Sequence, residues 1–155
     1  MPKVSIENIC DSDIADLATL HALCFEESWQ ANVMKNVLSP PEAFGLGLKL
    51  NRKLVAFILF RGIVLEGEIL SLAVDPLWRR EGFAIGLLRA TFLRARNKSI
   101  EEIFLEVAED NKPARDLYKR FGFTQIGLRK AYYRRKSGLN VDALTLKLRL
   151  DSLLL

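Results

Sequence analysis

The chain has 155 residues and a formal net charge of +4, and 50% of its residues are hydrophobic while 27% are charged. This length fits a single domain, residues 1–155, that can bury a sizeable core, and the composition excludes an intrinsically disordered chain. The longest apolar runs, such as residues 55–60, are far too short to span a bilayer, so no membrane partner is expected.

Hydrophobic spacing predicts the elements of the first half of the chain. They are a strand, two helices and a hairpin of two strands, at residues 4–9, around 14–21, and at 30–38, 43–50 and 54–61. Asp11 or Ser12 can cap the first helix, and the prolines after Ser39 end the second. Asn51, Arg52 and Lys53 form the expected turn of the hairpin.

The second half continues with a strand, a helix, a strand, a helix and two closing strands. They are predicted at residues 68–74, 82–97, 103–108, 111–121, 123–134 and 141–149. Asn111 can cap the second of these helices, Pro113 suits its first turn, and Gly122 suits its end. The complete order, β-α-α-β-β-β-α-β-α-β-β, belongs neither to a purely alternating α/β protein nor to a meander. It predicts a mixed sheet with helices on both faces.

Metal-binding patterns are absent from the sequence. Its two cysteines, Cys10 and Cys24, lack the paired spacing of zinc sites, so no metal is expected. The one histidine, His21, lies in a helix with apolar neighbours and is expected to have a structural role. The chain does not open with a basic and then apolar leader, which together with the unpaired cysteines favours a cytoplasmic location.

The connection after the strand at 68–74 is suited to binding an anion. The strand ends, a turn carries Arg79 and Arg80, and a helix begins at Gly82. Helix N-termini present unpaired N–H groups, and a glycine lets a phosphate approach the backbone closely. Dinucleotide and Walker patterns are missing. On spacing alone, an ordinary connection with two exposed arginines is the more common interpretation.

A basic stretch runs from residue 112 to residue 136. It contains nine lysines and arginines and one acid, Asp116. A solvated basic face is one interpretation. A surface for phosphates, from a nucleotide cofactor or from ribosomal RNA, is the other.

Two segments resemble the GCN5-related N-acetyltransferase (GNAT) family. Residues 79–84 read R-R-E-G-F-A, which is similar to the family's Q/R-x-x-G-x-G/A loop. Residues 105–123 are similar to its L-x-V-x-x-x-N-x-x-A-x-x-L-Y-x-x-x-G-F segment. The resemblance implies the GNAT fold, which is a mixed, mostly antiparallel sheet of six to seven strands flanked by about four helices. It also implies that acetyl-coenzyme A is the acetyl donor.

By the same resemblance, the pantetheine arm would pair with backbone beyond a bulge in the strand at 68–74, and the pyrophosphate would rest on amides at the start of the following helix. The implied cofactor residues are Leu72, Ala73, Val74, Arg79, Arg80, Glu81, Gly82, Phe83, Ala84, Ile85, Asn111 and Tyr118. Asn111 could also serve only as a helix cap.

Four features resemble the RimI type within this family. They are Glu106 between Leu105 and Val107, the run at 129–133, the Asp-Ala-Leu at 142–144, and Trp29. The RimI type acetylates the N-terminal amine of a ribosomal protein. The resemblance therefore implies a protein N-terminus as acceptor, bound by Trp29, Tyr132 and Tyr133. Phe25 precedes Trp29 by four residues, which departs from the common F-x-x-W form of the acceptor loop.

Two residues are candidates for the chemistry. Glu106 lies inside an apolar strand, on the same side as Phe104 and Ala108, where a carboxylate is unusual unless it is paired or functional. It could instead be a glutamate that reaches solvent. The resemblance makes Glu106 the general base, acting through a water, and Tyr118 the general acid. Glu68 is a rival base.

Two other functions remain open from the sequence. The chain could acetylate a small-molecule amine or a lysine side chain, with the same donor site and a different groove. It could also be a non-catalytic coenzyme-A-binding or RNA-binding module. Base-stacking aromatic patterns are missing and both candidate catalytic residues are retained, so no direct nucleic-acid partner is expected. A monomer or weak dimer is expected.

Overall fold

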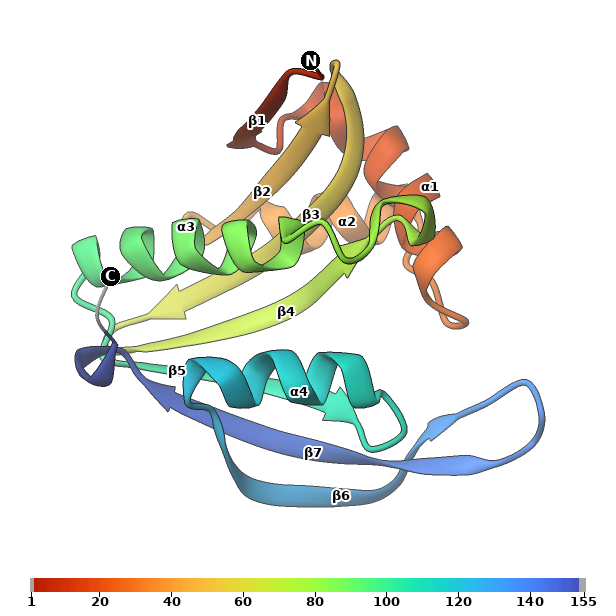
Figure 1. Cartoon of the computed structure of the whole chain (residues 1–155), viewed down its shortest axis with the longest axis vertical. Coiled ribbons are helices and arrows are strands. Elements are labelled where there is room, and N and C mark those ends of the chain that lie inside the picture. The colour runs from red at the N-terminus through yellow and green to blue at the C-terminus, as the bar shows by residue number, and fades with distance from the viewer. Residues whose placement is uncertain (1, 154–155) are drawn as a thin grey trace.

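A computed structural model describes residues 2–153 of the chain. This part forms seven strands in one sheet, in the order β1-β2-β3-β4-β5-β7-β6, and all neighbouring strands are antiparallel except β4 and β5 (Figure 1). The strands are β1 (Val4–Asn8), β2 (Ala43–Leu50), β3 (Lys53–Ile63), β4 (Glu66–Val74), β5 (Glu102–Ala108), β6 (Thr124–Arg134) and β7 (Asn140–Arg149). The helices are α1 (Ile14–Cys24), α2 (Ala31–Leu38), α3 (Phe83–Asn97) and α4 (Lys112–Phe121). The predicted fold class and element order are confirmed.

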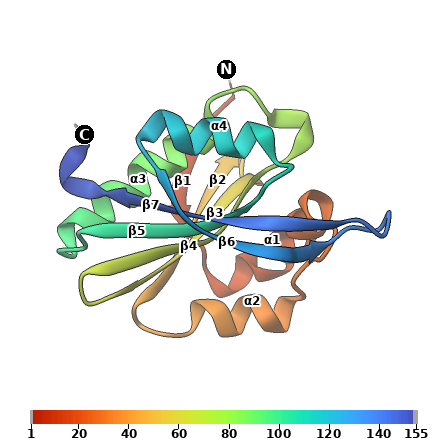
Figure 2. The ribbon, with the colours of Figure 1, turned by 90° about the horizontal axis from the view of Figure 1, so that it is seen from below.

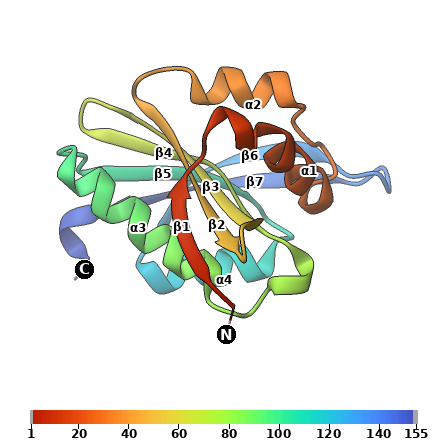
Figure 3. The ribbon, with the colours of Figure 1, turned by 90° about the horizontal axis from the view of Figure 1, so that it is seen from above.

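Two hydrophobic cores lie on opposite faces of the sheet. Helices α3 and α4 cover one face, and α1 and α2 cover the other, as Figures 2 and 3 show from opposite sides. The larger core joins Leu88 and Phe92 of α3 to the inward side chains of β2, β3, β5 and β7. The smaller core joins Leu17 of α1 and Met34 of α2 to Phe57 of β3. Burial of this apolar area holds the sheet between its helices.

The predicted start of the first helix was wrong in detail. A 3-10 turn, Asp11–Asp13, comes before α1, and neither Asp11 nor Ser12 caps it. Instead the Asp13 carboxylate accepts the Cys10 N–H at 2.8 Å and pairs with Lys49 at 2.9 Å. Asp13 therefore fastens the start of α1 to both the preceding chain and β2.

Strands β4 and β5 pair over only a short length. The parallel ladder joins Glu66–Glu68 to 102–104, and the two strands then diverge (Figure 1). Leu70 lies at a bulge, because Leu59 faces Ser71 while Phe60 faces Ile69. A bulge bends the strand that carries it, so β4 turns away just beyond its last contact with β5. The sheet thus opens into a fork whose two arms carry the predicted site.

Candidate active site

Free backbone amides line the loop between β4 and α3. Gly82 takes the left-handed conformation with φ of 80°, and Arg80 with φ of 67°. The first helical bond here joins Gly86 N–H to Gly82 O. Within residues 2–153 the amides from Arg80 to Ile85 have no hydrogen-bond partner. A Cβ at Gly82 would meet no atom within 4 Å, so the loop is open on that side of Gly82.

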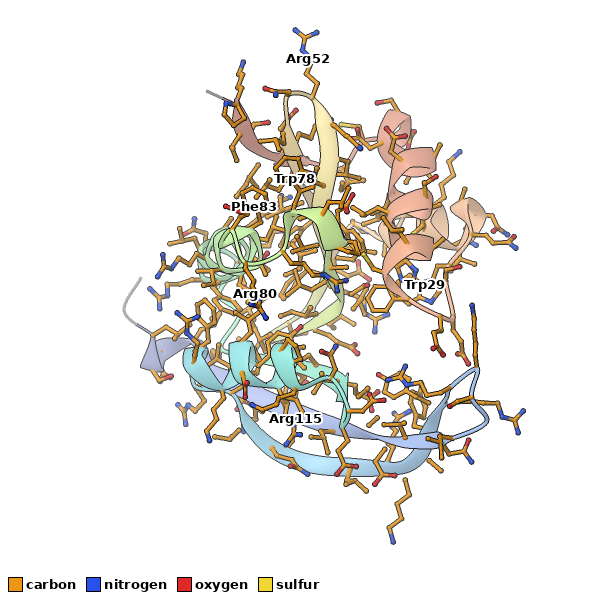
Figure 4. All side chains as sticks on the ribbon, turned by 45° about the vertical axis from the view of Figure 1, so that its right-hand side comes forward. Trp29, Arg52, Trp78, Arg80, Phe83 and Arg115 are labelled. Carbon is orange, nitrogen blue, oxygen red and sulfur yellow. The ribbon has the colours of Figure 1, made fainter. Side chains whose placement is uncertain are left out.

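The two arginines of this loop act differently. Arg79 Nε donates to the carbonyl of Val74 at 3.1 Å, which ties the loop back to the end of β4. Arg80 extends from the loop toward α4 (Figure 4). The predicted anion site therefore has an open cradle of amides with the positive charge of Arg80 beside it.

Backbone groups of β4 also face the fork. Asp75 N–H donates to Val55 O, and Ala73 lies opposite Phe57. In an antiparallel ladder, every second residue of a strand forms its backbone hydrogen bonds with the same neighbouring strand. Because Asp75 bonds to β3, Ala73, two residues earlier, does so as well. Leu72 and Val74 turn their backbone groups toward the gap beside β5. Of the three predicted pantetheine contacts, Ala73 already uses its backbone groups on β3. Leu72 presents its backbone groups to the fork, and Val74 presents its N–H, because its carbonyl already accepts from Arg79 Nε and Cys24 Sγ.

Glu106 lies on the opposite arm of the fork, on β5. Its side chain is 24% exposed, and its Oε2 lies 3.1 Å from Nε of Arg129 on β6. The guanidinium N–H is not aligned with this oxygen, so Oε2 is buried without a hydrogen bond among the described residues. Arg129 therefore compensates the charge of Glu106, and Oε2 keeps the capacity to accept a hydrogen bond.

An open groove of about 330 Å³ begins at Glu106 and runs along β4 and β5. Its lining is Arg61, Ile63, Glu66, Gly67, Glu68, Phe104, Leu105, Glu106, Arg129 and Thr145. Glu68, the rival base, pairs with Arg61 at 3.1 Å where β4 and β5 are still joined. It therefore lies at the closed end of the fork, away from the free amides.

Tyr118 projects from α4 into the larger core. Its ring packs edge-on against Phe123 with centroids 5.5 Å apart. Burial, together with the nearby Tyr133 hydroxyl, raises the pKa of Tyr118 well above that of a free tyrosine. Burial and the Glu106 carboxylate raise the pKa of Tyr133 in the same way. Tyr133 is thus within electrostatic reach of both candidate catalytic residues, which belong to different elements.

Asn111 caps α4 as predicted. Its Oδ1 accepts the Ala114 N–H at 3.3 Å, and the residue is exposed. The cap uses the side-chain oxygen, and the amide NH₂ stays available for a ligand.

Trp29 is fixed by His21. The two rings stack with centroids 5.0 Å apart, and the backbone N–H of Trp29 donates to His21 Nδ1 at 3.1 Å. His21 also contacts Phe25 and Phe57, and burial lowers its pKa to about 4. The imidazole is therefore neutral at working pH and holds the loop between α1 and α2, in keeping with its expected structural role.

The tyrosine pair lies on a wide bulge of β6. Arg129 faces Ala143 and Tyr133 faces Val141, so three residues of β6 stand opposite Asp142 alone. Ala131 takes a φ of 54°, and its N–H donates to the Asp142 carboxylate at 2.8 Å. The bulge turns Tyr132 outward, where Arg129 lies over its ring at 4.9 Å.

Three contributors to the site were not found from the sequence. Arg129 is the partner of Glu106, Asp142 holds the β6 bulge, and Glu26 accepts the Lys136 N–H at 3.0 Å, which joins the α1–α2 loop to the β6–β7 hairpin. In the sequence, the Asp-Ala-Leu at 142–144 and the run at 129–133 indicate a family type but not these contacts. Nothing local marks these pairs, because each joins residues far apart in the chain or across two strands.

The basic stretch is largely a solvated face. Lys112 pairs with Asp116 at 2.7 Å, Arg115 donates to Glu109 O, and Arg135 binds the Asp110 carboxylate with two nitrogens. Several of its charges are thus compensated within the chain. Among residues 2–153, no cluster of three or more metal-ligating side chains occurs, and no helix has the length and apolarity needed to cross a membrane.

Comparison with known proteins places these features in context. Residues 14–123 match the acetyltransferase (GNAT) family. The chain is 30% identical over 145 residues to the ribosomal protein bS18-alanine N-acetyltransferase of Haemophilus ducreyi, covering 92% of this chain and 98% of that one. It is 31% identical over 137 residues to the N-alpha-acetyltransferase RimI of Mycobacterium tuberculosis, covering 84% and 85%.

Solved structures share the fold. The ribosomal-protein-S18-alanine N-acetyltransferase of Escherichia coli superposes with a TM-score of 0.90 at 22% identity, covering 99% of this chain and all of that one. Arabidopsis thaliana NAA60, solved in complex with a bisubstrate analogue, superposes with a TM-score of 0.85 at 18% identity, covering 95% and 98%.

Proposed function

We propose that this chain transfers the acetyl group of acetyl-coenzyme A to the N-terminal α-amine of a ribosomal protein. The chain belongs to the acetyltransferase (GNAT) family. Relatives named for this reaction on bS18 align over nearly the whole chain, which supports the acceptor class. The observation that carries the proposal is the fork between β4 and β5. One arm of the fork leads to the free amides before α3, and the other arm carries the partly exposed carboxylate of Glu106.

The residues present fit the donor. The amides from Arg80 to Ile85 would receive its pyrophosphate, with Arg79, Arg80 and the glycine at position 82 shaping the loop. The outward backbone groups of Leu72 and the N–H of Val74 would pair with its pantetheine amides. The thioester supplies an activated acyl carbon for the incoming amine.

Glu106 is the proposed general base. Its carboxylate is 24% exposed and can accept a proton from the acceptor ammonium, directly or through one water. A peptide α-amine titrates near 8 and lysine near 10.4, so deprotonating the α-amine is easier by about 3.3 kcal/mol. A carboxylate that relays the proton through water suits the easier task. Glu68 is the less favoured candidate for the base, because its carboxylate is paired with Arg61 at the closed end of the fork.

Tyr118 is the proposed general acid. Because its pKa is raised by burial, its hydroxyl keeps its proton throughout the working pH range. In the proposed step that proton passes to the leaving sulfur. Trp29, held by His21, and the pair Tyr132 and Tyr133 would flank the acceptor's first residues.

The acceptor class can be tested with two peptides that both contain a lysine, one with a free N-terminus and one with that amine blocked. Thiol release from acetyl-coenzyme A is expected with the free peptide only. Turnover of the blocked peptide would identify a lysine acetyltransferase instead.

The base can be tested with Glu106→Gln, which should lower kcat by about a hundredfold or more. The loss should be largest at low pH, where little amine is neutral. Glu102→Gln is the matched control, because Glu102 lies on the same strand and face, paired to Lys147 at 2.6 Å. Equal activity of the two variants would remove Glu106 from the mechanism.

A further inference from the structure

The hairpin that joins β3 and β4 exposes three consecutive apolar side chains. Ile63, Val64 and Leu65 are 56%, 82% and 46% exposed. Single exposed apolar residues are ordinary, but a contiguous group on a loop tip indicates a contact surface. Glu66 and Glu101 adjoin this tip, and neither forms an ion pair within residues 2–153.

The backbone at the tip is strained as well. Ile63 faces Glu66 across a two-residue turn in which Val64 has a φ of 55° and Leu65 does not have a positive φ. Such a turn favours glycine at its first central position, and a β-branched residue there is a conformational outlier. The other tight hairpin, at Asn51 and Arg52, follows the usual turn chemistry at its first position. Val64 thus combines backbone strain with an exposed apolar side chain, a combination that points to function.

The tip is held rigidly. The carbonyl of Leu65 accepts the N–H of Glu101 at 2.7 Å, which fastens the turn to the start of β5. On either side of the turn, a Cβ at Gly62 would collide with Ile100, and a Cβ at Gly67 would collide with the Phe60 ring. These glycines let the hairpin pack closely against the core, so the backbone that carries the exposed apolar side chains is held in place.

The tip continues the groove that starts at Glu106. Ile63 and Glu66 line that groove. Glu66 is level with Glu102, four residues before Glu106 on β5, so the tip lies about 13 Å from the proposed base. In the other direction the α1–α2 loop and the β6–β7 hairpin are joined by the bond from Lys136 to Glu26. Figure 2 shows the β3–β4 and β6–β7 hairpins at opposite ends of the sheet.

We propose that this tip is a docking ridge for the acceptor polypeptide beyond its first residues. The inference rests on the proposed function and extends it. An extended acceptor whose N-terminus is at Glu106 would reach the tip after about five residues. The apolar side chains with two unpaired carboxylates beside them select a segment that carries aliphatic and basic side chains.

The experiment compares a four-residue peptide with a ten-residue peptide of the same first four residues whose positions six to ten alternate leucine and arginine. For the unaltered chain, kcat/KM for the long peptide should exceed that for the short one by about tenfold. In Val64→Asn with Leu65→Ser this ratio should fall close to one, while turnover of the short peptide stays unchanged. Asparagine tolerates the left-handed conformation, so the turn should persist.

Leu93→Ser is the matched control, because Leu93 is 49% exposed on α3, on the other face of the sheet, and the variant should keep the tenfold ratio. Equal kcat/KM for both peptides with the unaltered chain would overturn the ridge. So would a sedimentation result in which the tip variant dissociates a dimer, since the occupant would then be a second copy. Absence of turnover with the short peptide would instead refute the proposed function.

Discussion

Protonation of His21 should uncouple the loop that carries Trp29. The imidazole is 3% exposed, and its Nδ1 accepts the backbone N–H of Trp29. A proton on Nδ1 would leave two N–H donors facing each other and would break this hydrogen bond. Burial lowers the folded-state pKa from 6.5 to about 4. The unfolded chain therefore binds the proton at a higher pH than the folded chain, and stability is lost as the pH falls from about 6.5 toward 4. Between pH 7 and pH 5 this linkage amounts to about 2 kcal/mol.

The assay is urea unfolding at pH 7 and pH 5, followed by tryptophan fluorescence, for the unaltered chain and for His21→Phe. Phenylalanine keeps the stack on Trp29 and does not titrate. It leaves the Trp29 N–H unpaired, so the variant should be less stable at pH 7 by about 1–3 kcal/mol. The variant should nevertheless lose about 2 kcal/mol less than the unaltered chain between the two pH values. If both proteins lose equal stability, His21 does not titrate as its burial requires.

The remaining predictions concern the donor and acceptor sites. Tyr118→Phe should lower kcat by about a hundredfold and leave acetyl-coenzyme A affinity, measured by calorimetry, largely unchanged, since the ring still fills its buried space. Gly82→Ala, at a φ of 80°, should lower stability by about 1 kcal/mol and weaken donor binding, as thermal melts with and without acetyl-coenzyme A would report. Asp142→Ala removes the acceptor of the Ala131 N–H and should raise KM for the peptide while KM for the donor stays constant.

Features that depend on local sequence were predicted well. Asn111 caps α4 and Gly122 ends it with a φ of 100°, because caps are settled by a few neighbouring residues. The hairpin around Asn51 and Arg52 follows in the same way from short-range turn chemistry. The start of α1 was mistaken because Asp13 bonds backward to Cys10 and across to Lys49, and the second contact depends on tertiary structure. The resemblance, and not spacing, supplied the proposed roles of Glu106 and Tyr118.

The geometry that joins the two halves of the site could not be predicted, because it arises from pairing between distant strands. The bulge at Leu70 exists only relative to the register of β3, and the fork exists only because β4 bends just after Glu68 has paired with Phe104. Val64 is the opposite case. A β-branched residue disfavours a positive φ, yet Val64 adopts one in this turn. Tertiary contacts stabilise both the turn at Val64 and the bulge at Leu70. The turn is held through the hydrogen bond to Leu65 O, and the bulge through pairing with β3. Departures from local preference therefore fall where β4 begins and where it bends, at the two ends of the stretch that borders the proposed acceptor path.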